Sequence, residues 1–232
     1  MFPLYEEETV NFSEMWQTWV RVMTSPNEAT FAAERQKPTA TLTTALIWML
    51  IAGVVAGVLG LLQSMMMAGA VQGALPQMLD QANLPPEAKA QLLPLLNSGM
   101  LGGLGAGSLA SIITVPISFL IGAAILWLVA KLLGGVGDYG RYAYLLSTFT
   151  APLTIVSAVL GLIPFVGGCI AFILYIYQYV LTYYATKVEH QLSSGRAIIV
   201  VLIPIILVVL LIGCFLLFLG GLVAAMMNVQ PQ

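Results

Sequence analysis

Charged residues are scarce in this sequence. Asp, Glu, Lys and Arg make up 8% of its 232 residues, whereas 59% are hydrophobic. A soluble domain carries about 25% charged residues. This composition excludes a soluble fold and fits a chain whose solvent is lipid. The net charge of −2 gives no basic footprint for a nucleic acid, so none is expected as a partner.

Histidine and cysteine are also rare, which limits the chemistry. Cys169 and Cys214 both lie in apolar runs and fit no metal-ligand spacing, so we expect them to be buried as small hydrophobes. No H-E-x-x-H motif and no serine nucleophile beside a base is present. No ionisable residue falls in the middle of an apolar run, where it would indicate a functional site. The sequence predicts no enzyme, no cofactor and no metal.

Long apolar runs are what the sequence does contain. A membrane-spanning helix needs roughly 20 such residues, and it must be helical because lipid offers the backbone no hydrogen-bond partner. The predicted fold class is all-α, a polytopic membrane bundle of five transmembrane helices with an N-terminal amphipathic helix. The five predicted spans are 44–68, 108–133, 142–163, 168–187 and 197–225.

The remaining segments complete the predicted organisation. Residues 1–42 form a cytoplasmic N-terminal segment, 43–226 the membrane domain and 227–232 a short tail. Residues 69–106 are expected to form an extracytoplasmic loop with a surface helix opened by the prolines at 85 and 86. The glycines at 102, 103, 105 and 107 are expected to separate this helix from the second span.

Basic residues predict the orientation. Only Lys89 falls on the outer side, and the other seven Lys and Arg residues flank the opposite ends of the spans. Cytoplasmic loops carry the excess of Lys and Arg, so the N-terminus is expected inside and the C-terminus outside. The seven are Arg21, Arg35, Lys37, Lys131, Arg141, Lys187 and Arg196.

A glycine pattern raises the question of nucleotide binding. Gly135, Gly137 and Gly140 form a G-x-G-x-x-G. A dinucleotide fingerprint follows a strand and opens a soluble helix. Here the pattern lies between two apolar runs, so it predicts a tight turn between membrane helices and no phosphate site.

The N-terminal segment predicts two helices. Asn11 and Glu14 form a capping-box pattern, and Ser25 followed by Pro26 predicts the start of a second helix. The first helix has apolar residues at helical spacing, and we expect both Trp16 and Trp19 to be buried. Two interpretations stay open: the helix lies in the headgroup layer, or it docks on the span ends or on a partner.

Polar aromatic residues distinguish the fourth predicted span. Tyr175, Gln178 and Tyr179 place hydroxyl and amide groups within it. One interpretation is an intramembrane polar cavity or an aromatic wall for a lipid. The other is hydrogen bonding between helices, with Tyr183 and Tyr184 in the interfacial belt.

Smaller motifs concern helix packing. Gly53 and Gly57 form a G-x-x-x-G that predicts close packing of the first span. The prolines at 116, 152 and 204 are expected to kink their helices.

The cytoplasmic face is the predicted partner site. One interpretation is a docking surface for another protein, and the other is that the charges only set topology and meet lipid headgroups. The residues assigned to the docking surface are Trp16, Trp19, Asp138, Arg141, Glu189 and His190.

Three stretches carry a family resemblance. These are "WVRVMTSPNEATF", "GDYGRYAYLLSTFTAPLTIVSAVLGLIPFVGG" and "KVEHQLSSGRAIIVVLI", with Gly140, Tyr144 and Pro152 at fitting positions. Over residues 12–220 the chain resembles the Yip family of membrane proteins, named for interaction with Ypt/Rab GTPases. Eukaryotic members carry a longer polar N-terminal region with an Asp-Leu-Tyr-Gly-Pro motif. This chain has neither, so it resembles the prokaryotic branch and a bacterial inner (cell) membrane is expected.

The resemblance implies a non-enzymatic membrane scaffold or adaptor, or an accessory subunit of a membrane assembly. Its expected partners are the lipid bilayer and other membrane proteins, and a homo-oligomer is compatible with the sequence. The alternative is a transporter or channel for a neutral or lipidic solute.

Overall fold

The computed structural model describes residues 11–81, 86–163 and 166–227, with backbone alone over most of 70–106 and over 221–227. This part of the chain contains seven helices and no strand, which confirms the all-α prediction. The helices are α1 (Phe12–Thr24), α2 (Glu28–Arg35), α3 (Leu42–Gln81), α4 (Pro86–Leu132), α5 (Tyr139–Leu160), α6 (Val166–His190) and α7 (Ser194–Met227).

Five of these helices are long and apolar enough to cross a membrane, as predicted. The predicted and observed spans agree to within a few residues, and the chain is an integral membrane protein. Residues 228–232 of the predicted tail lie outside the described residues. The spans are Leu42–Gly69, Gly107–Leu132, Tyr139–Leu160, Val166–His190 and Ser194–Gly220.

Helix α5 forms the centre of the core. Its residues 142–149 and 151–153 are all buried. It packs against α3 and α6, and α1 and α2 also contact it. The helix continues through Pro152, which is buried as well.

Helices α3 and α4 pack closely along a line of small residues. A side chain at Gly53 would lie 3.1 Å from the Ser111 carbonyl oxygen, and one at Gly57 would lie 3.0 Å from the Ser108 carbonyl oxygen. Ser111 also donates from Oγ to the Gly53 carbonyl oxygen at 3.2 Å. The predicted packing face at Gly53 and Gly57 is therefore confirmed, with α4 as its partner.

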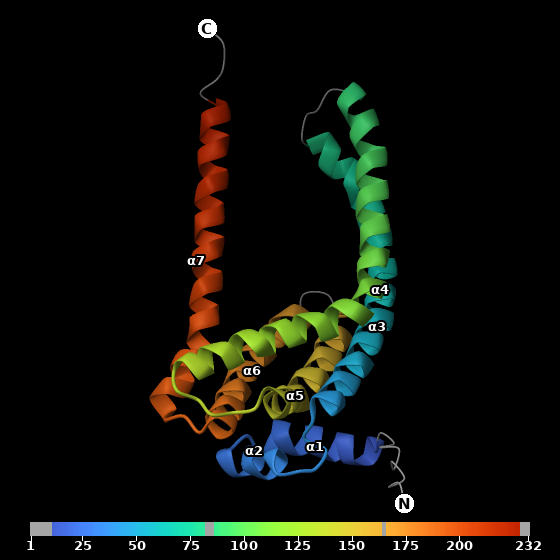
Figure 1. The fold of residues 1–232 in the computed structure, drawn as a ribbon. Coiled ribbons are helices and arrows are strands. Elements are labelled where there is room, and N and C mark those ends of the chain that lie inside the picture. Colours follow the sequence, from blue (N-terminus) through green and yellow to red (C-terminus); the bar gives the residue numbers. More distant parts are fainter. Residues whose placement is uncertain (1–10, 82–85, 164–165, 228–232) are drawn as a thin grey trace, which may run out of the picture.

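The region between the first two spans differs from the prediction of a loop. Helix α3 continues to Gln81, and α4 runs from Pro86 to Leu132 with no break at the glycines. An interior glycine costs only about 1 kcal/mol relative to alanine, so the presence of glycines does not by itself end a helix. At 1.5 Å per residue, α3 and α4 are about 60 and 70 Å long. They form a hairpin that extends away from the other helices (Figure 1).

Helix α4 bends strongly on its way back from the hairpin (Figure 1). It contains Pro94 and Pro116, and proline is a residue type that kinks helices. After the bend, α4 crosses the remaining helices and contacts α5, α6 and α7.

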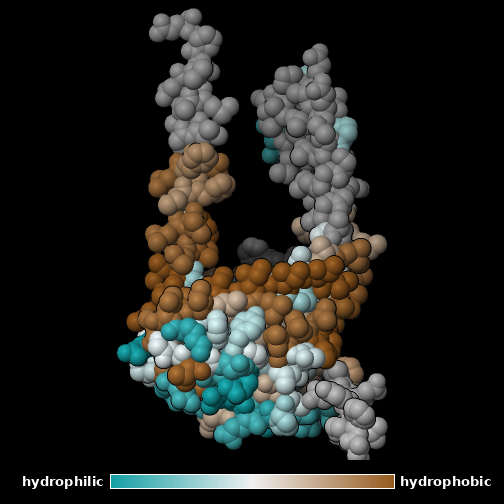
Figure 2. Space-filling model, viewed as in Figure 1, coloured by the Kyte–Doolittle hydropathy of each residue, from teal (hydrophilic) through white to brown (hydrophobic). Residues whose placement is uncertain are grey.

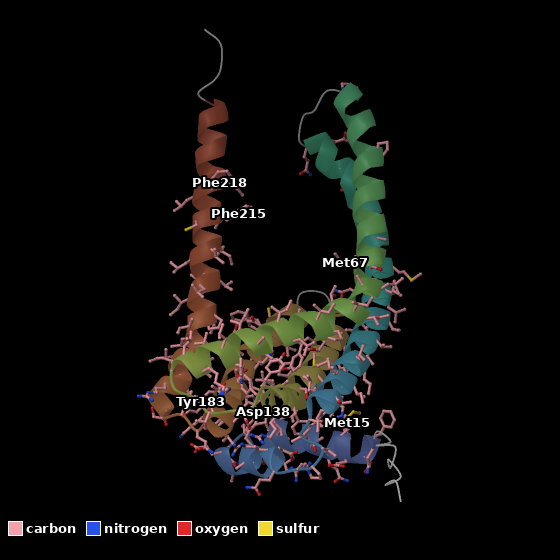
Figure 3. The ribbon with its side chains drawn as sticks, in the orientation of Figure 1. Met15, Met67, Asp138, Tyr183, Phe215 and Phe218 are labelled. Carbon is pink, nitrogen blue, oxygen red and sulfur yellow. The ribbon has the colours of Figure 1, made fainter. Side chains whose placement is uncertain are left out.

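Helix α7 is mostly exposed beyond its first turns. Phe215 and Phe218 project from it far from the other helices (Figure 3), with exposed fractions of 59% and 67%. Cys214 and Cys169 are exposed too, contrary to our expectation of buried thiols. Apolar runs in a membrane chain face lipid as readily as core, so a position in an apolar run does not predict burial within the protein.

Helices α1 and α2 cover one end of the molecule. We call them the cap. Polar residues gather over the cap and the adjacent turns, whereas the spans are largely apolar (Figure 2). The hydrophobic spans and the hydrophilic cap thus occupy different levels of the molecule.

Candidate functional site

The first cap helix begins and ends where the sequence predicted. Asn11 accepts a hydrogen bond from the Glu14 backbone N–H at 3.2 Å. One face, including Met15, Trp19 and Val22, is buried. Trp19 meets Trp48 of α3 edge-on, with 5.9 Å between ring centroids. Docking on the span ends is therefore the correct interpretation for this face.

A second apolar stripe on α1 stays exposed. Phe12, Trp16 and Val20 have exposed fractions of 63%, 64% and 42%. The expectation that Trp16 is buried was wrong, because the core accommodates the face of Met15 and Trp19. For this exposed stripe, contact with the headgroup layer or with a partner stays a prediction.

The second cap helix starts later than predicted. Its N-cap is Asn27, whose side chain accepts from the Thr30 N–H at 2.9 Å. Ser25 instead closes α1, because its N–H donates to the Arg21 carbonyl oxygen at 2.9 Å. Asparagine is among the preferred N-cap residues, and it competes successfully with the Ser25-Pro26 signal.

Helix α2 carries a buried aromatic ring and a buried carboxylate on one face. Phe31 is fully buried, with ring centroids 6.2 Å from Phe149 and 6.3 Å from Tyr184. Glu34, one turn later, is also fully buried and pairs with Arg21. Lys37 Nζ lies 2.8 Å from Glu34 Oε2. Arg21 and Lys37 thus compensate the negative charge of Glu34, which would be costly to bury alone.

Helix α5 also supplies a hydrogen bond to the Glu34 carboxylate. Tyr144 of α5 donates from its hydroxyl to Glu34 Oε2 at 3.1 Å. Lys37 also donates to Thr18 of α1 at 2.8 Å. Glu34 therefore connects α1, α2 and α5 through charged and neutral hydrogen bonds.

A second buried carboxylate, Glu189, lies at the end of α6. It is fully buried, and Arg35 of α2 donates to its Oε2 at 2.8 Å. The Asp138 N–H donates to Oε1 at 2.8 Å, and Arg141 Nε lies 3.3 Å from the same oxygen. Glu189 thus holds the cap, the α4–α5 turn and α5 together.

The glycines of the G-x-G-x-x-G are explained by this packing. A side chain at Gly137 would lie 2.7 Å from His190 Nδ1, and one at Gly135 would lie 2.9 Å from the same atom. Gly134 has a φ of +90°, which side chains of other residues adopt with strain. The predicted turn is confirmed, and its backbone contacts Glu189 and His190.

His190 behaves as a core ring. Its exposed fraction is 1%, and it meets Tyr142 edge-on with 4.7 Å between centroids. Neither ring nitrogen has a hydrogen-bond partner among the residues that the structure describes. The Val136 N–H donates to the His190 carbonyl oxygen at 3.2 Å, which fixes the turn over the ring.

The six predicted docking residues divide into two groups. Trp19, Glu189 and His190 are buried within this chain, so they do not form part of its exposed surface. Trp16 and Asp138 are exposed, and the Arg141 side chain is 44% exposed. Figure 3 shows Asp138 at the same end of the molecule as the cap.

Sequence analysis missed Glu34 as a site residue. The available signal was its spacing of three from Phe31, which places both residues on one face of α2. The ion-pair partners of Glu34 and Glu189 come from distant parts of the chain and carried no local signal.

The seven basic residues predicted to share one side do gather at the cap end. Five of them form ion pairs there. The remaining two are Lys131, which lies 5.5 Å above the Trp127 ring, and Arg196, which donates to the Leu133 carbonyl oxygen at 3.4 Å. The ion-paired residues are Arg21, Arg35, Lys37, Arg141 and Lys187.

Two cavities lie among the spans beside the polar residues of α6. Each has a volume of about 430 Å³, and Tyr175 and Gln178 line both. Tyr179 lines the second and donates from its hydroxyl to that of Tyr175 at 2.8 Å. Tyr177 is different, because its hydroxyl donates to the Met23 carbonyl oxygen of α1 at 2.7 Å.

Five apolar helices and a polar helical cap define a polytopic integral membrane protein. A family model described as the Yip1 domain matches residues 20–227, which include α3–α7 and most of the cap. The chain therefore belongs to the Yip1 domain family, as the resemblance predicted. No curated protein and no solved structure matches it.

Proposed function

We propose that this protein is a non-enzymatic membrane scaffold or adaptor whose cap presents a docking face to another membrane-associated protein. The observation that carries the proposal is the attachment of the cap to the spans. Two fully buried carboxylates, Glu34 and Glu189, hold α1 and α2 in place. A surface fixed in this way is preorganised, which lowers the entropic cost of binding.

The outer face of α2 is the part of the cap proposed to bind. Ala29 and Ala33 on this helix and Gln36 at its C-cap are exposed. None of them takes part in the ion pairs that hold the cap. Small side chains on a rigid helix permit close approach of a partner.

The orientation and membrane form part of the proposal. The gathering of seven Lys and Arg residues at the cap end supports a cytoplasmic cap, an N-terminus inside and a C-terminus outside. We also propose a bacterial inner membrane, because the spans are rich in Ala, Gly and Leu and in this resemble those of the prokaryotic branch.

The absence of enzymatic activity is supported by the engagement of the acidic groups. Four carboxylates of the cap and of the adjacent end of α6 take part in ion pairs. Glu14, Glu28, Glu34 and Glu189 each have a basic partner.

Quantitative co-purification tests the docking face. The double variant Ala29→Arg/Ala33→Arg adds two long charged side chains to exposed positions, so partner recovery from mild detergent should fall at least tenfold. The control is Gly195→Arg, because a Cβ there meets nothing within 4 Å and the site lies on α7. Equal recovery with the double variant and the wild type would contradict a docking role for α2.

A further inference from the structure

We propose that the two cavities together bind one neutral, hydroxyl-bearing membrane lipid of the monoacylglycerol type. Its polar end lies among α3, α4, α5 and α6, and its hydrocarbon chain lies among α4, α6 and α7. The two cavities are contiguous because five residues line both: Gly122, Leu126, Tyr175, Gln178 and Thr182. This inference is independent of the docking face on the cap.

The first cavity supplies uncharged hydrogen-bonding groups. Thr154 and Thr182 donate to carbonyl oxygens of their own helices at 2.8 Å, so their hydroxyl oxygens remain available as acceptors. Ser118 and Thr150 also line this cavity. Hydroxyl groups of a ligand would find several acceptors here.

Donors are available at the junction of the cavities. Among the described residues, the Gln178 side chain makes no hydrogen bond, and the Tyr175 hydroxyl accepts from Tyr179 but has no acceptor for its own proton. A polar group without a partner in an apolar environment costs free energy. A ligand carbonyl or hydroxyl would satisfy both groups.

The second cavity has the character of a hydrocarbon site. Its α7 wall consists of Val201, Pro204, Ile205, Val208 and Val209. A methylene group is about the size of a water molecule, which occupies roughly 30 Å³. A cavity of about 430 Å³ therefore holds about 14 such groups. One chain of common lipid length therefore fills it.

The surroundings select a neutral lipid over an ion or a water-soluble solute. Neither cavity is lined by a charged residue. Tyr175 and Val209 are 55% and 63% exposed on the membrane-spanning helices, so the second cavity opens toward the bilayer. A molecule already in the membrane can enter laterally with its polar end directed toward Gln178.

A larger side chain at Gly122 would fill the space that the two cavities share. It lines both cavities, and a Cβ built on it meets nothing within 4 Å. Gly122→Leu therefore places an isobutyl group in the cavities, and leucine also favours the helix more than glycine does. Gly213→Leu on α7 is the matched control, because its Cβ is equally unobstructed and it lines neither cavity.

The experiment uses the purified full chain in lipid nanodiscs with a photoreactive, clickable monoacylglycerol. The wild type and Gly213→Leu should be labelled equally, with adducts in α6 or α7. The labelling of Gly122→Leu should be at least tenfold weaker than that of the wild type, and the labelling of Gln178→Leu should be severalfold weaker. An anionic fatty-acid probe of the same chain length, used at pH 9, should label the wild type several times more weakly.

Labelling of Gly122→Leu at the wild-type level would overturn the proposal, as would equal labelling by the anionic probe. If Gly122→Leu does not fold, Gln178→Leu decides by the same criterion. Ala29→Arg/Ala33→Arg should leave lipid labelling unchanged, so a failure of the lipid site is distinguishable from a failure of the docking face.

Discussion

Arg35 of α2 donates from Nε to Oε2 of Glu189 at 2.8 Å, which joins residues 154 positions apart. The Glu189 side chain is fully buried, and that of Arg35 is 28% exposed. The contact attaches the N-terminal cap to the end of the fourth span. The position of the cap therefore depends on a carboxylate that lies far from it in the sequence.

Neutralising Glu189 should destabilise the protein. Glu189→Gln keeps the shape of the side chain but leaves Arg35 and Arg141 without their counter-charge. Both arginines are partly exposed, so the cost should lie below the about 3–5 kcal/mol of a pair whose remaining charge stays buried. Thermal unfolding in detergent should show a clearly lower midpoint, and cap amides should exchange faster. Glu28→Gln is the control, since Glu28 is 55% exposed in its pair with Lys187 and should change the midpoint little.

The glycine turn provides a second test. Gly137→Ala would place a methyl group 2.7 Å from His190 Nδ1 and 2.9 Å from Glu189 Cγ. Such overpacking costs about 1–3 kcal/mol, so the unfolding midpoint should fall. Gly195→Ala meets nothing within 4 Å and should not lower it. Equal midpoints for the two variants would show that the turn does not need glycine for close approach.

The two tryptophans of α1 should respond differently to substitution. Trp19 is 4% exposed and packs on Trp48, so Trp19→Ser should cost about 3–5 kcal/mol and speed amide exchange across α1. Trp16 is 64% exposed, and Trp16→Ser should leave exchange nearly unchanged. The assignment of the docked face is incorrect if Trp16→Ser releases the helix as strongly as Trp19→Ser does.

The proposed orientation predicts the sidedness of chemical labelling. Cys169 and Cys214 are first replaced by serine, and single cysteines are then introduced at Gln36 in the cap and Gln81 at the end of α3. Both positions are exposed. A membrane-impermeant maleimide added to intact bacteria should label position 81, and position 36 should react only after the membrane is opened. The reverse pattern would contradict a cytoplasmic cap.

Features with a local cause were predictable from the sequence. The five spans follow from long apolar runs, and α1 follows from the spacing of Met15 and Trp19 with a cap at Asn11. The turn at Gly135 and Gly137 also follows from its apolar flanks. In each case the determining residues lie within one segment of the chain.

Features that depend on contacts between segments were not predictable in the same way. The exposure of Trp16 depends on which stripe of α1 meets α3, and both stripes have helical spacing. Burial of Glu189 requires Arg35 and the turn at Asp138, which only the fold brings together. The unbroken course of α4 through Gly102–Gly107 runs against local glycine propensity, and no residue within that segment predicts it.

Site-specific photo-crosslinking in intact membranes tests the central claim most directly. A photoreactive amino acid at Ala33, on the exposed face of α2, should give a discrete protein adduct. The same amino acid at Leu217, which is 79% exposed on α7, should give mainly lipid adducts. The Ala33 adduct should disappear when Ala29→Arg is introduced beside it. If position 33 yields no protein adduct, or one that survives Ala29→Arg unchanged, the cap is not the docking surface proposed here.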